Sequence, residues 1–287
     1  MRLGDSFFQL KLGEKEIMKT SPMKRFGLMA FMSAMMLFLM TACGAGGSND
    51  SVNNGSGSNS AQTVSSYQPS AEEKEEMRTR FTPLLETNKE TIAHVYIPGS
   101  DLDEPVVQTS DNATYLDKTF DGGNEPYMGT VFMDMDNKKD FSDRLTWLFG
   151  HARGSKVGDH RMFNDVNYFS DSTYFNEHKY VVVETPTRKF YYEAMCMVIV
   201  PETTAFYRTS FKDDKEFTDQ LTKVREDAQV KNDDIKVSAK DKYLVLSTCR
   251  EEDETIRANL YLRQIPDAEM EQFAKDHASE LTYVAKR

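Results

Sequence analysis

Between residues 92 and 265 the sequence is a series of short runs rich in apolar, β-branched and aromatic residues. Turn-forming residues such as Pro98-Gly99 and Asp121-Gly-Gly123 separate the runs, so none of them can continue as a long helix. Eight short strands in one domain are typical of a β-barrel or a β-sandwich. The sequence therefore predicts a mainly β fold, with strands at residues 94–97, 105–108, 130–133, 145–149, 180–184, 189–200, 243–247 and 258–264.

Two other segments have the periodicity of amphipathic helices. Residues 71–85 are charged, with apolar residues at helical spacing, and we expect Pro83 to end this N-terminal helix early. Residues 215–228 carry one apolar face and follow acidic residues that favour a helix start. This long helical insertion precedes the last two strands, and shorter insertions are predicted at residues 112–116 and 162–175.

The first 43 residues have the pattern of a membrane-targeting segment. The basic pair Lys24-Arg25 precedes an uninterrupted apolar run at residues 26–40, and small residues then lead to Cys43. The positive-inside rule places everything after this run on the extracytoplasmic face of the cell membrane. Two outcomes remain open: residues 1–43 are a signal peptide with a lipobox that leaves Cys43 lipidated, or they are an uncleaved membrane anchor.

Composition divides the rest of the chain into a linker and one domain. Residues 44–70 are rich in Gly, Ser and Asn, which predicts a flexible linker, and residues 71–287 form the folded domain. The formal net charge of −11 argues against nucleic acid as a partner. The three cysteines, Cys43, Cys196 and Cys249, have neither the spacing of a disulfide framework nor that of a metal site, so we predict no metal and no cofactor.

One cysteine stands where a nucleophile would be useful. Cys249 follows a strand that ends in Ser247 and Thr248, and an acidic loop comes next, so we expect its thiol on a rigid support and open to solvent. Cysteines without a disulfide more often simply pack in a core, so this placement alone is a weak signal. Cys196, within an apolar run, is interpreted as a core residue and a poor nucleophile.

A histidine repeats the placement of Cys249. His151 follows the apolar run at residues 145–149 and a glycine, and it precedes a polar loop. The alternative is a structural histidine whose ring is satisfied by a loop carbonyl. Arg257 and Arg263 lie beyond the cysteine on the next strand, and they share one parity, so alternation alone cannot tell which of them faces the thiol.

Taken in order, these residues resemble the class B sortases of Gram-positive bacteria. The resemblance runs from about residue 88 to residue 265, and the helical insertion before the cysteine strand is similar to the one that marks class B. Val245 and Arg208 depart from the family pattern. The motifs that carry the resemblance are Tyr96-Ile-Pro-Gly99, Pro105-Val-Val-Gln108, Asp111-Asn112 with Tyr115-Leu116, Phe120-Asp-Gly122, Phe132-Met-Asp134, Leu148-Phe-Gly-His151, Met162-Phe163 and Leu246-Ser-Thr-Cys249 followed by Arg257.

The resemblance implies an eight-stranded sortase-type barrel and membrane-tethered transpeptidation. Cys249 would attack the threonine carbonyl of a sorting signal, Asn-Pro-x-Thr followed by Asn or Gly, and form a thioacyl enzyme. An amine of a peptidoglycan cross-bridge or a pilin lysine would then release the bound surface protein. His151 matches the general acid/base and Arg257 the oxyanion-stabilising arginine. The substrate-binding positions would be Asn112, Leu116, Thr203, Tyr207 and Ser247.

Two other functions remain compatible with the sequence. The first is a thiol peptidase or hydrolase on the same fold, because the residues that form a thioacyl intermediate do not dictate whether water or an amine resolves it. The second is a non-catalytic surface lipoprotein that binds peptides in the same groove.

Overall fold

The computed structural model describes residues 67–126, 128–152, 161–204, 206–250, 253 and 255–286. The segments predicted as signal peptide or anchor (1–43) and most of the linker (44–70) lie outside these residues. Within the described part of the chain, no helix combines the length and the apolar character needed to cross a membrane.

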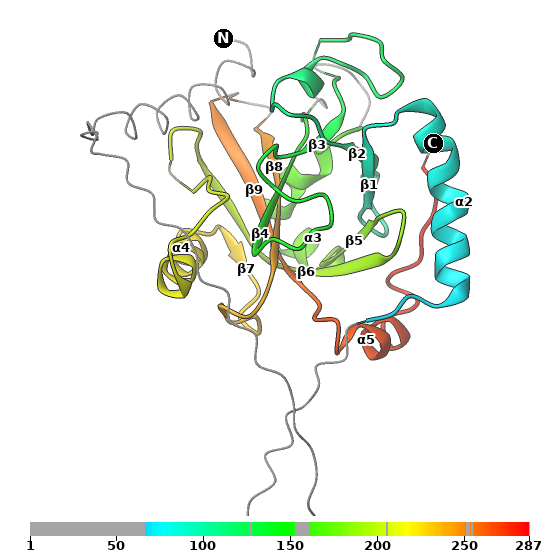
Figure 1. Cartoon of the computed structure of the whole chain (residues 1–287). Coiled ribbons are helices and arrows are strands. Elements are labelled where there is room, and N and C mark those ends of the chain that lie inside the picture. Colours follow the sequence, from blue (N-terminus) through cyan, green and yellow to red (C-terminus); the bar gives the residue numbers. More distant parts are fainter. Residues whose placement is uncertain are drawn as a thin grey trace, which may run out of the picture.

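Eight strands form one closed barrel (Figure 1). Neighbouring strands follow the order β5-β1-β2-β3-β4-β8-β9-β6, and pairing between β5 and β6 closes the ring. A ninth strand, β7 (Val230–Lys231), pairs with β6 outside the ring. The barrel strands are β1 (Thr91–Tyr96), β2 (Asp103–Val107), β3 (Val131–Met133), β4 (Leu145–Phe149), β5 (Tyr180–Glu184), β6 (Lys189–Pro201), β8 (Tyr243–Cys249) and β9 (Ile256–Gln264).

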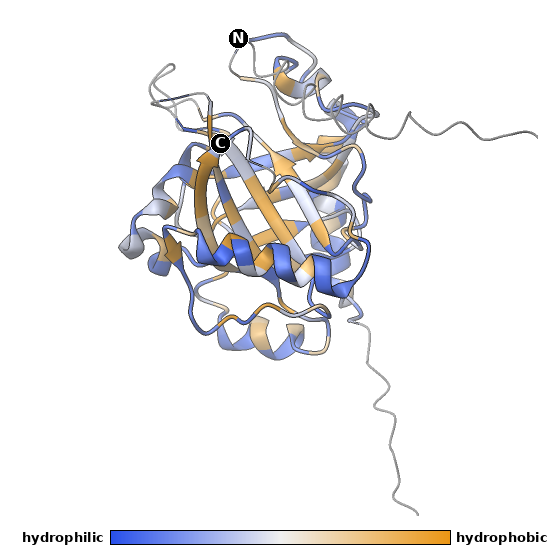
Figure 2. Ribbon diagram, turned by 90° about the vertical axis from the view of Figure 1, so that its left-hand side faces the viewer, coloured by the Kyte–Doolittle hydropathy of each residue, from blue (hydrophilic) through white to orange (hydrophobic). Residues whose placement is uncertain are grey.

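Two apolar clusters occupy the two faces of the strands. One contains residues from all eight barrel strands, for example Leu244 and Leu246 of β8, and is therefore the barrel interior. The other contains the alternate residues Tyr243 and Val245 and lies on the outer face. Alternation along a strand thus decides which side chains point outward. Figure 2 shows the apolar colouring of the strands beside the polar surface of the helices.

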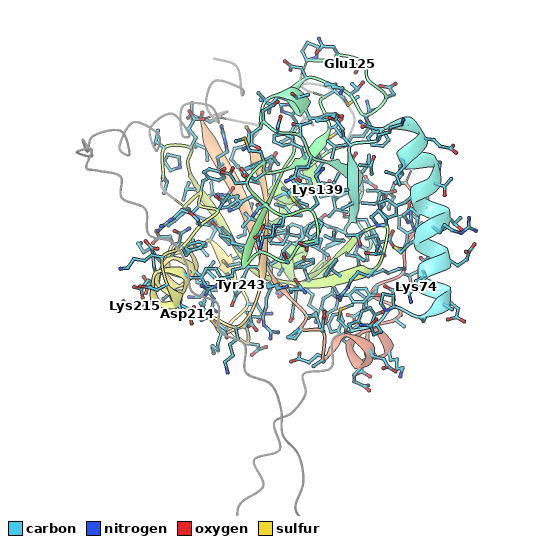
Figure 3. The ribbon with its side chains drawn as sticks, viewed as in Figure 1. Lys74, Glu125, Lys139, Asp214, Lys215 and Tyr243 are labelled. Carbon is cyan, nitrogen blue, oxygen red and sulfur yellow. The ribbon has the colours of Figure 1, made fainter. Side chains whose placement is uncertain are left out.

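Helices cover parts of the barrel surface. Helix α4 (Asp214–Glu226) is the long insertion predicted before the cysteine strand, and its buried Phe217, Leu221 and Val224 pack in the outer cluster. Its charged side chains, such as Lys215, lie at the molecular edge in Figure 3. The shorter helices are η1 (Thr114–Leu116), η2 (Asn164–Ser170), α3 (Ser172–Glu177) and α5 (Met270–Asp276).

The N-terminal helix α2 (Ala71–Thr87) is longer than predicted. The expectation that Pro83 would cut it short is wrong, because the helix continues for another turn to Thr87. Pro83 lacks only its own backbone donor, and the turn after it is still closed: the Thr87 hydroxyl and the Asn88 backbone N–H donate to the carbonyls of Pro83 and Leu84 at 3.0 and 2.8 Å. The buried Met77 and Phe81 hold the preceding turns against the domain.

A buried anion, Glu184 of β5, joins α2 to the barrel. Its side chain is 0% exposed and lies 2.5 Å from Arg80 of α2 and 3.3 Å from Lys189 of β6. Removing one partner from such a cluster leaves the other charges poorly solvated. We therefore expect Glu184→Ala to lower the free energy of unfolding by about 3 kcal/mol, measured by urea unfolding. The control Glu76→Ala, which removes an exposed partner of Lys189, should cost less than about 1 kcal/mol; equal losses would contradict the buried role.

Candidate functional site

Cys249 is the last residue of β8 and points to the outer face of the barrel. It has the same parity as Tyr243 and Val245, whose side chains lie in the outer cluster. The expectation that its thiol would be open to solvent is wrong, because Cys249 is only 5% exposed. Helix η2 packs against β8, and the Asn167 side-chain amide donates to the Cys249 carbonyl at 3.1 Å, so this end of the strand is covered.

His151 is held just beyond the end of β4. Strands β4 and β8 are parallel, and the Gly150 N–H extends their pairing by donating to the Ser247 carbonyl at 3.2 Å. A side chain at Gly150 would clash, since a Cβ there would lie 2.8 Å from the ring of Phe163. The glycine therefore lets the backbone pass close to Phe163. This path places His151 beside Ser247.

The imidazole of His151 is oriented by a backbone carbonyl. Its Nε2 lies 2.6 Å from the carbonyl oxygen of Leu116, and the His151 side chain is buried. A carbonyl oxygen only accepts, so Nε2 carries a proton. In the neutral ring Nδ1 is then the basic nitrogen.

Arg257 lies directly across from the cysteine. In the antiparallel pair β8–β9, Cys249 is in register with Arg257, so both side chains leave the same face. The Arg257 Nη2 donates to Glu202 Oε2 at 2.7 Å, and both side chains are largely buried. The register also answers the question that parity left open: Arg263 pairs with Tyr243 at the other end of β8 and binds Asp241 at 2.7 Å.

A small cavity brings the predicted nucleophile and base together. Cys249, His151 and Ser247 line it, with Leu116 and Phe149 among the apolar walls. The cavity lies at the ends of β4 and β8 where the two parallel strands stop side by side. A thiol, an imidazole and, one strand away, a guanidinium thus meet at one end of the barrel. This combination can form and resolve an acyl–sulfur bond.

The predicted substrate-binding residues fall into three groups. Leu116 and Ser247 line the cavity with the thiol. Asn112 and Tyr207 meet at the carboxylate of Asp134: the Asn112 amide donates to it at 2.7 Å, and the Tyr207 hydroxyl also donates to it. Thr203 is exposed and does not line this cavity.

Asp134 is a site residue that the sequence named only within a motif. It is 0% exposed, directly after β3, and it ties the loop of Asn112 to the loop of Tyr207. An aspartate after a short strand is normally a turn residue. Only its burial marks Asp134 as different, and the sequence does not show that burial. Glu202, the partner of Arg257, was likewise not singled out.

Cys196 is a core residue, as interpreted from the sequence. It is 0% exposed in the middle of β6, and burial raises the pKa of its thiol to about 12. We expect iodoacetamide at about pH 8 to leave it unmodified in the folded protein, because the thiolate is the reactive form. Peptide mapping by mass spectrometry tests this, with urea-unfolded protein as the control in which Cys196 reacts. Alkylation of Cys196 in the folded protein would be the contrary result.

The remaining histidines and acids form no metal site in the described part of the chain, where no three metal-binding side chains of His, Cys, Asp or Glu cluster suitably. His94 is buried in β1 and lies 2.8 Å from Asp103. His178 stacks on Tyr174, and His277 lies 2.5 Å from Glu280. His160 lies outside the described residues.

Comparisons with known proteins give a consistent set of relatives. No family model matches the sequence. Sortase B of Listeria monocytogenes is 30% identical over 176 residues, which cover 61% of this chain and 68% of that protein. Sortase B of Staphylococcus aureus is 26% identical over 178 residues, 62% of this chain and 70% of that protein. The structure of a Staphylococcus aureus sortase B–substrate complex matches with a TM-score of 0.60 at 25% identity, covering 66% of this chain and 86% of that one.

Proposed function

Because the chain belongs to the class B sortases, which are cysteine transpeptidases, we propose that it cleaves an Asn-Pro-x-Thr-(Asn/Gly) sorting signal after threonine and transfers it to an amine. The observation that carries the assignment of residues is a cavity lined by both Cys249 and His151, with Arg257 in register beside the cysteine. The structural match to a Staphylococcus aureus sortase B–substrate complex supports the binding of a substrate at this cavity.

The reaction has two acyl-transfer steps. The Cys249 sulfur attacks the threonine carbonyl carbon, a carbon–sulfur bond forms, and the amide carbon–nitrogen bond breaks. His151 gives a proton to the leaving amine. An incoming amine then attacks the thioacyl carbon and loses a proton to His151, and the sulfur leaves as thiolate. The groups balance because one amide bond is exchanged for another.

The charge state of the pair needs help from the site. With ordinary pKa values of about 8.5 for Cys and about 6.5 for His, moving the proton from sulfur to imidazole costs roughly 2.7 kcal/mol, so about 1% of molecules would hold the reactive pair. Arg257 favours the thiolate through its positive charge. Its N–H donors also face the oxyanion that develops on the threonine carbonyl. Glu202 holds the guanidinium in place for both roles.

The loops that carry Asn112 and Tyr207 are held together by one carboxylate. Asp134 binds Asn112 and Tyr207, which come from two different loops, and it thereby sets the spacing between them. The proposed role of Asn112 in reading the polar residues of the signal rests on its place in the motif, whereas Leu116 and Ser247 line the cavity with the thiol. Thr203 contributes from the exposed loop after β6 once peptide is bound.

The protein acts outside the membrane that carries it. The basic pair and apolar run before Cys43 support export, and the small residues next to it support lipidation at Cys43. Surface proteins with the signal would be the donors, and a cell-wall cross-bridge or a pilin lysine the acceptor. Labelling of cells with an alkyne fatty acid should mark the wild type and not Cys43→Ala. A labelled Cys43→Ala protein, or an unlabelled wild type of full mass, would favour the uncleaved anchor.

The transfer itself is tested with a fluorogenic Asn-Pro-Gln-Thr-Asn peptide, with and without triglycine as the amine. We expect a ligated product only when the amine is present, and none with Cys249→Ala. Cleavage that gives only the free acid in both conditions would make the protein a hydrolase. Absence of cleavage together with tight peptide binding would make it a binding protein.

A further inference from the structure

A second, larger cavity opens at the other end of the barrel. Its volume is about 720 Å³, within the range of about 300–1,000 Å³ that is usual for small-ligand sites. Its wall includes Asp241 and Lys242, which precede β8, and Gln264, which ends β9. Cys249 lies at the opposite end of β8, six residues beyond Tyr243, so the two sites are separated by about 20 Å of strand.

The cavity floor is apolar and rigid. Phe190 of β6 is buried and packs on Phe141 with ring centroids 5.7 Å apart. Ile92 of β1 is also buried at the wall, and Pro186 and Pro266 add flat apolar surface. Such walls suit the apolar part of a ligand.

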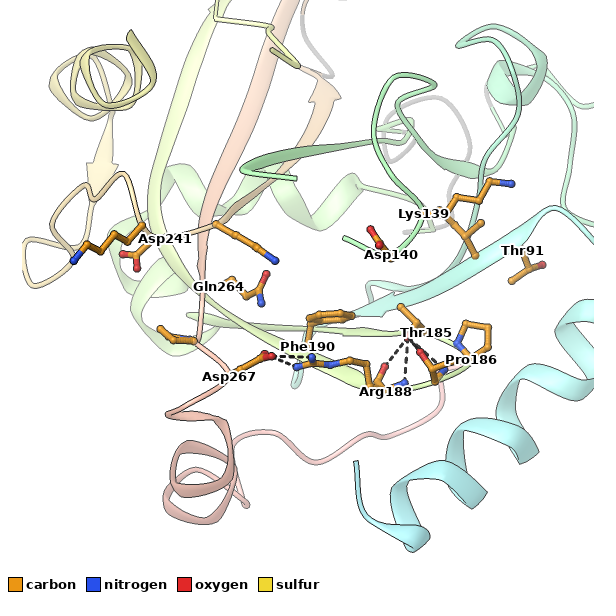
Figure 4. A pocket seen from close by; sticks show the side chains of 15 residues that line it. Thr91, Lys139, Asp140, Thr185, Pro186, Arg188, Phe190, Asp241, Gln264 and Asp267 are labelled. Carbon is orange, nitrogen blue, oxygen red and sulfur yellow. Dashed lines mark hydrogen bonds and ion pairs between the residues drawn. The ribbon is translucent and has the colours of Figure 1, made fainter. Parts of the chain in front are cut away.

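One buried polar group in the wall has no partner. Gln264 is 7% exposed, and its side-chain Oε1 accepts no hydrogen bond in the structure. In Figure 4 its amide points into the space above Phe190. A buried amide oxygen of this kind is satisfied by an N–H or O–H donor. A ligand with an N–H or O–H donor at the bottom of the cavity would satisfy this oxygen of Gln264.

The charges at this cavity favour anions. Arg188 binds Asp267 at 2.7 Å, and Asp241 is neutralised by Arg263 at 2.7 Å. The other charged lining residues are one acid and three lysines, and Lys242 is close enough to Asp267 to lower the pKa of that carboxyl; the four are Asp140, Lys139, Lys240 and Lys242. A net positive rim on a chain of net charge −11 is a local reversal of sign.

We infer that this end of the barrel is a second binding site, which takes a short peptide bearing carboxylate groups. Backbone N–H groups of the peptide supply the donor that Gln264 lacks, its side chain packs on Phe190, and its carboxylates meet Lys240 and Lys242. Lysine stems are long enough to swing over the mouth of the cavity. The site lies away from the thiol, so the inference does not depend on the proposed reaction.

Calorimetry on the full chain carrying Cys249→Ala tests the site without interference from catalysis. The probe is N-acetyl-Leu-Glu with its terminal carboxylate, and the matched neutral ligand is N-acetyl-Leu-Gln amide. We expect the acidic dipeptide to bind at least about tenfold more tightly than the neutral one. Equal affinities, or no binding of the acidic dipeptide, would overturn the inference. Inorganic phosphate that competes as strongly as the dipeptide would also overturn it, because the site would then read charge alone.

Variants separate the two recognition features. Gln264→Leu should raise the dipeptide Kd by about fivefold or more and leave the melting temperature unchanged, since it removes a group with no hydrogen bond at Oε1. Combining Lys240→Ala with Lys242→Ala should remove the preference for the acidic dipeptide. Lys215→Ala on α4, an exposed lysine outside the cavity, is the control and should change nothing. An unchanged Kd in both cavity variants would refute the site.

Discussion

Replacing Cys249 by alanine should reduce amine-dependent ligation by about 10⁴-fold or more, because the only other thiol among the described residues, that of Cys196, is buried in β6 and cannot form the acyl intermediate. The fold should persist, since alanine removes only a sulfur at the outer end of β8. The measurement is ligation of the fluorogenic sorting peptide to triglycine, followed by mass spectrometry of the enzyme for an acyl adduct. Wild type should show the adduct when the amine is withheld.

The matched control for this substitution is Cys196→Ala. Cys196 is fully buried in β6 and its thiol pKa is raised to about 12 by that burial, so its removal should leave the adduct and the turnover near wild type. A Cys249→Ala enzyme that still forms an acyl adduct would reject Cys249 as the nucleophile. The alanine variant should still bind the sorting peptide, which separates loss of chemistry from loss of the groove.

Arg257→Lys should retain the fold and lose turnover by about 10²- to 10³-fold, the usual effect of removing one oxyanion donor. Lysine keeps the positive charge but not the planar fork that lets arginine bind Glu202 and face the substrate together. We expect the loss in kcat rather than in KM, because the oxyanion develops only after binding. Near-normal turnover would remove Arg257 from the mechanism.

Arg263→Lys is the control that the fold itself provides. Arg263 leaves the same face of β9 and also binds a carboxylate, that of Asp241, but it lies at the far end of the strand from the thiol. Arg263→Lys should therefore cost little turnover.

Glu202→Gln keeps the shape of the side chain beside Arg257 but removes the negative charge that holds the guanidinium, so we expect an intermediate loss in kcat.

The strands were predictable because turn residues bound each apolar run. Strands β4 and β5 begin and end where the sequence indicates, and the others differ at their ends by a few residues. Ring closure was not readable, because it depends on β5 pairing with β1 and β6, and a sandwich would use the same alternation. Strand β7 has only two residues, which is too short for a period to show.

The residues of the candidate site could be proposed from the sequence, whereas their surroundings could not. Cys249 and His151 were visible because each ends an apolar run. The burial of Cys249 was not, since it depends on Asn167 of η2, which lies 82 residues earlier in the chain. The choice between Arg257 and Arg263 required the register of β8 and β9. Asp134 acquired its importance only through contacts from two distant loops.

The chain enters the domain at the end of the barrel opposite Cys249. The ring of Tyr67 lies 4.8 Å from the guanidinium of Arg188, and Glu73 accepts from the Lys189 backbone at 2.7 Å. Both contacts are made where β6 begins, whereas its far end pairs with Ile256 beside the arginine of the site. If the residues before Tyr67 form the proposed membrane tether, it holds the domain at the end of the barrel that lies away from Cys249. In that arrangement the donor and the acceptor of the proposed reaction would reach the thiol from the side that faces away from the membrane.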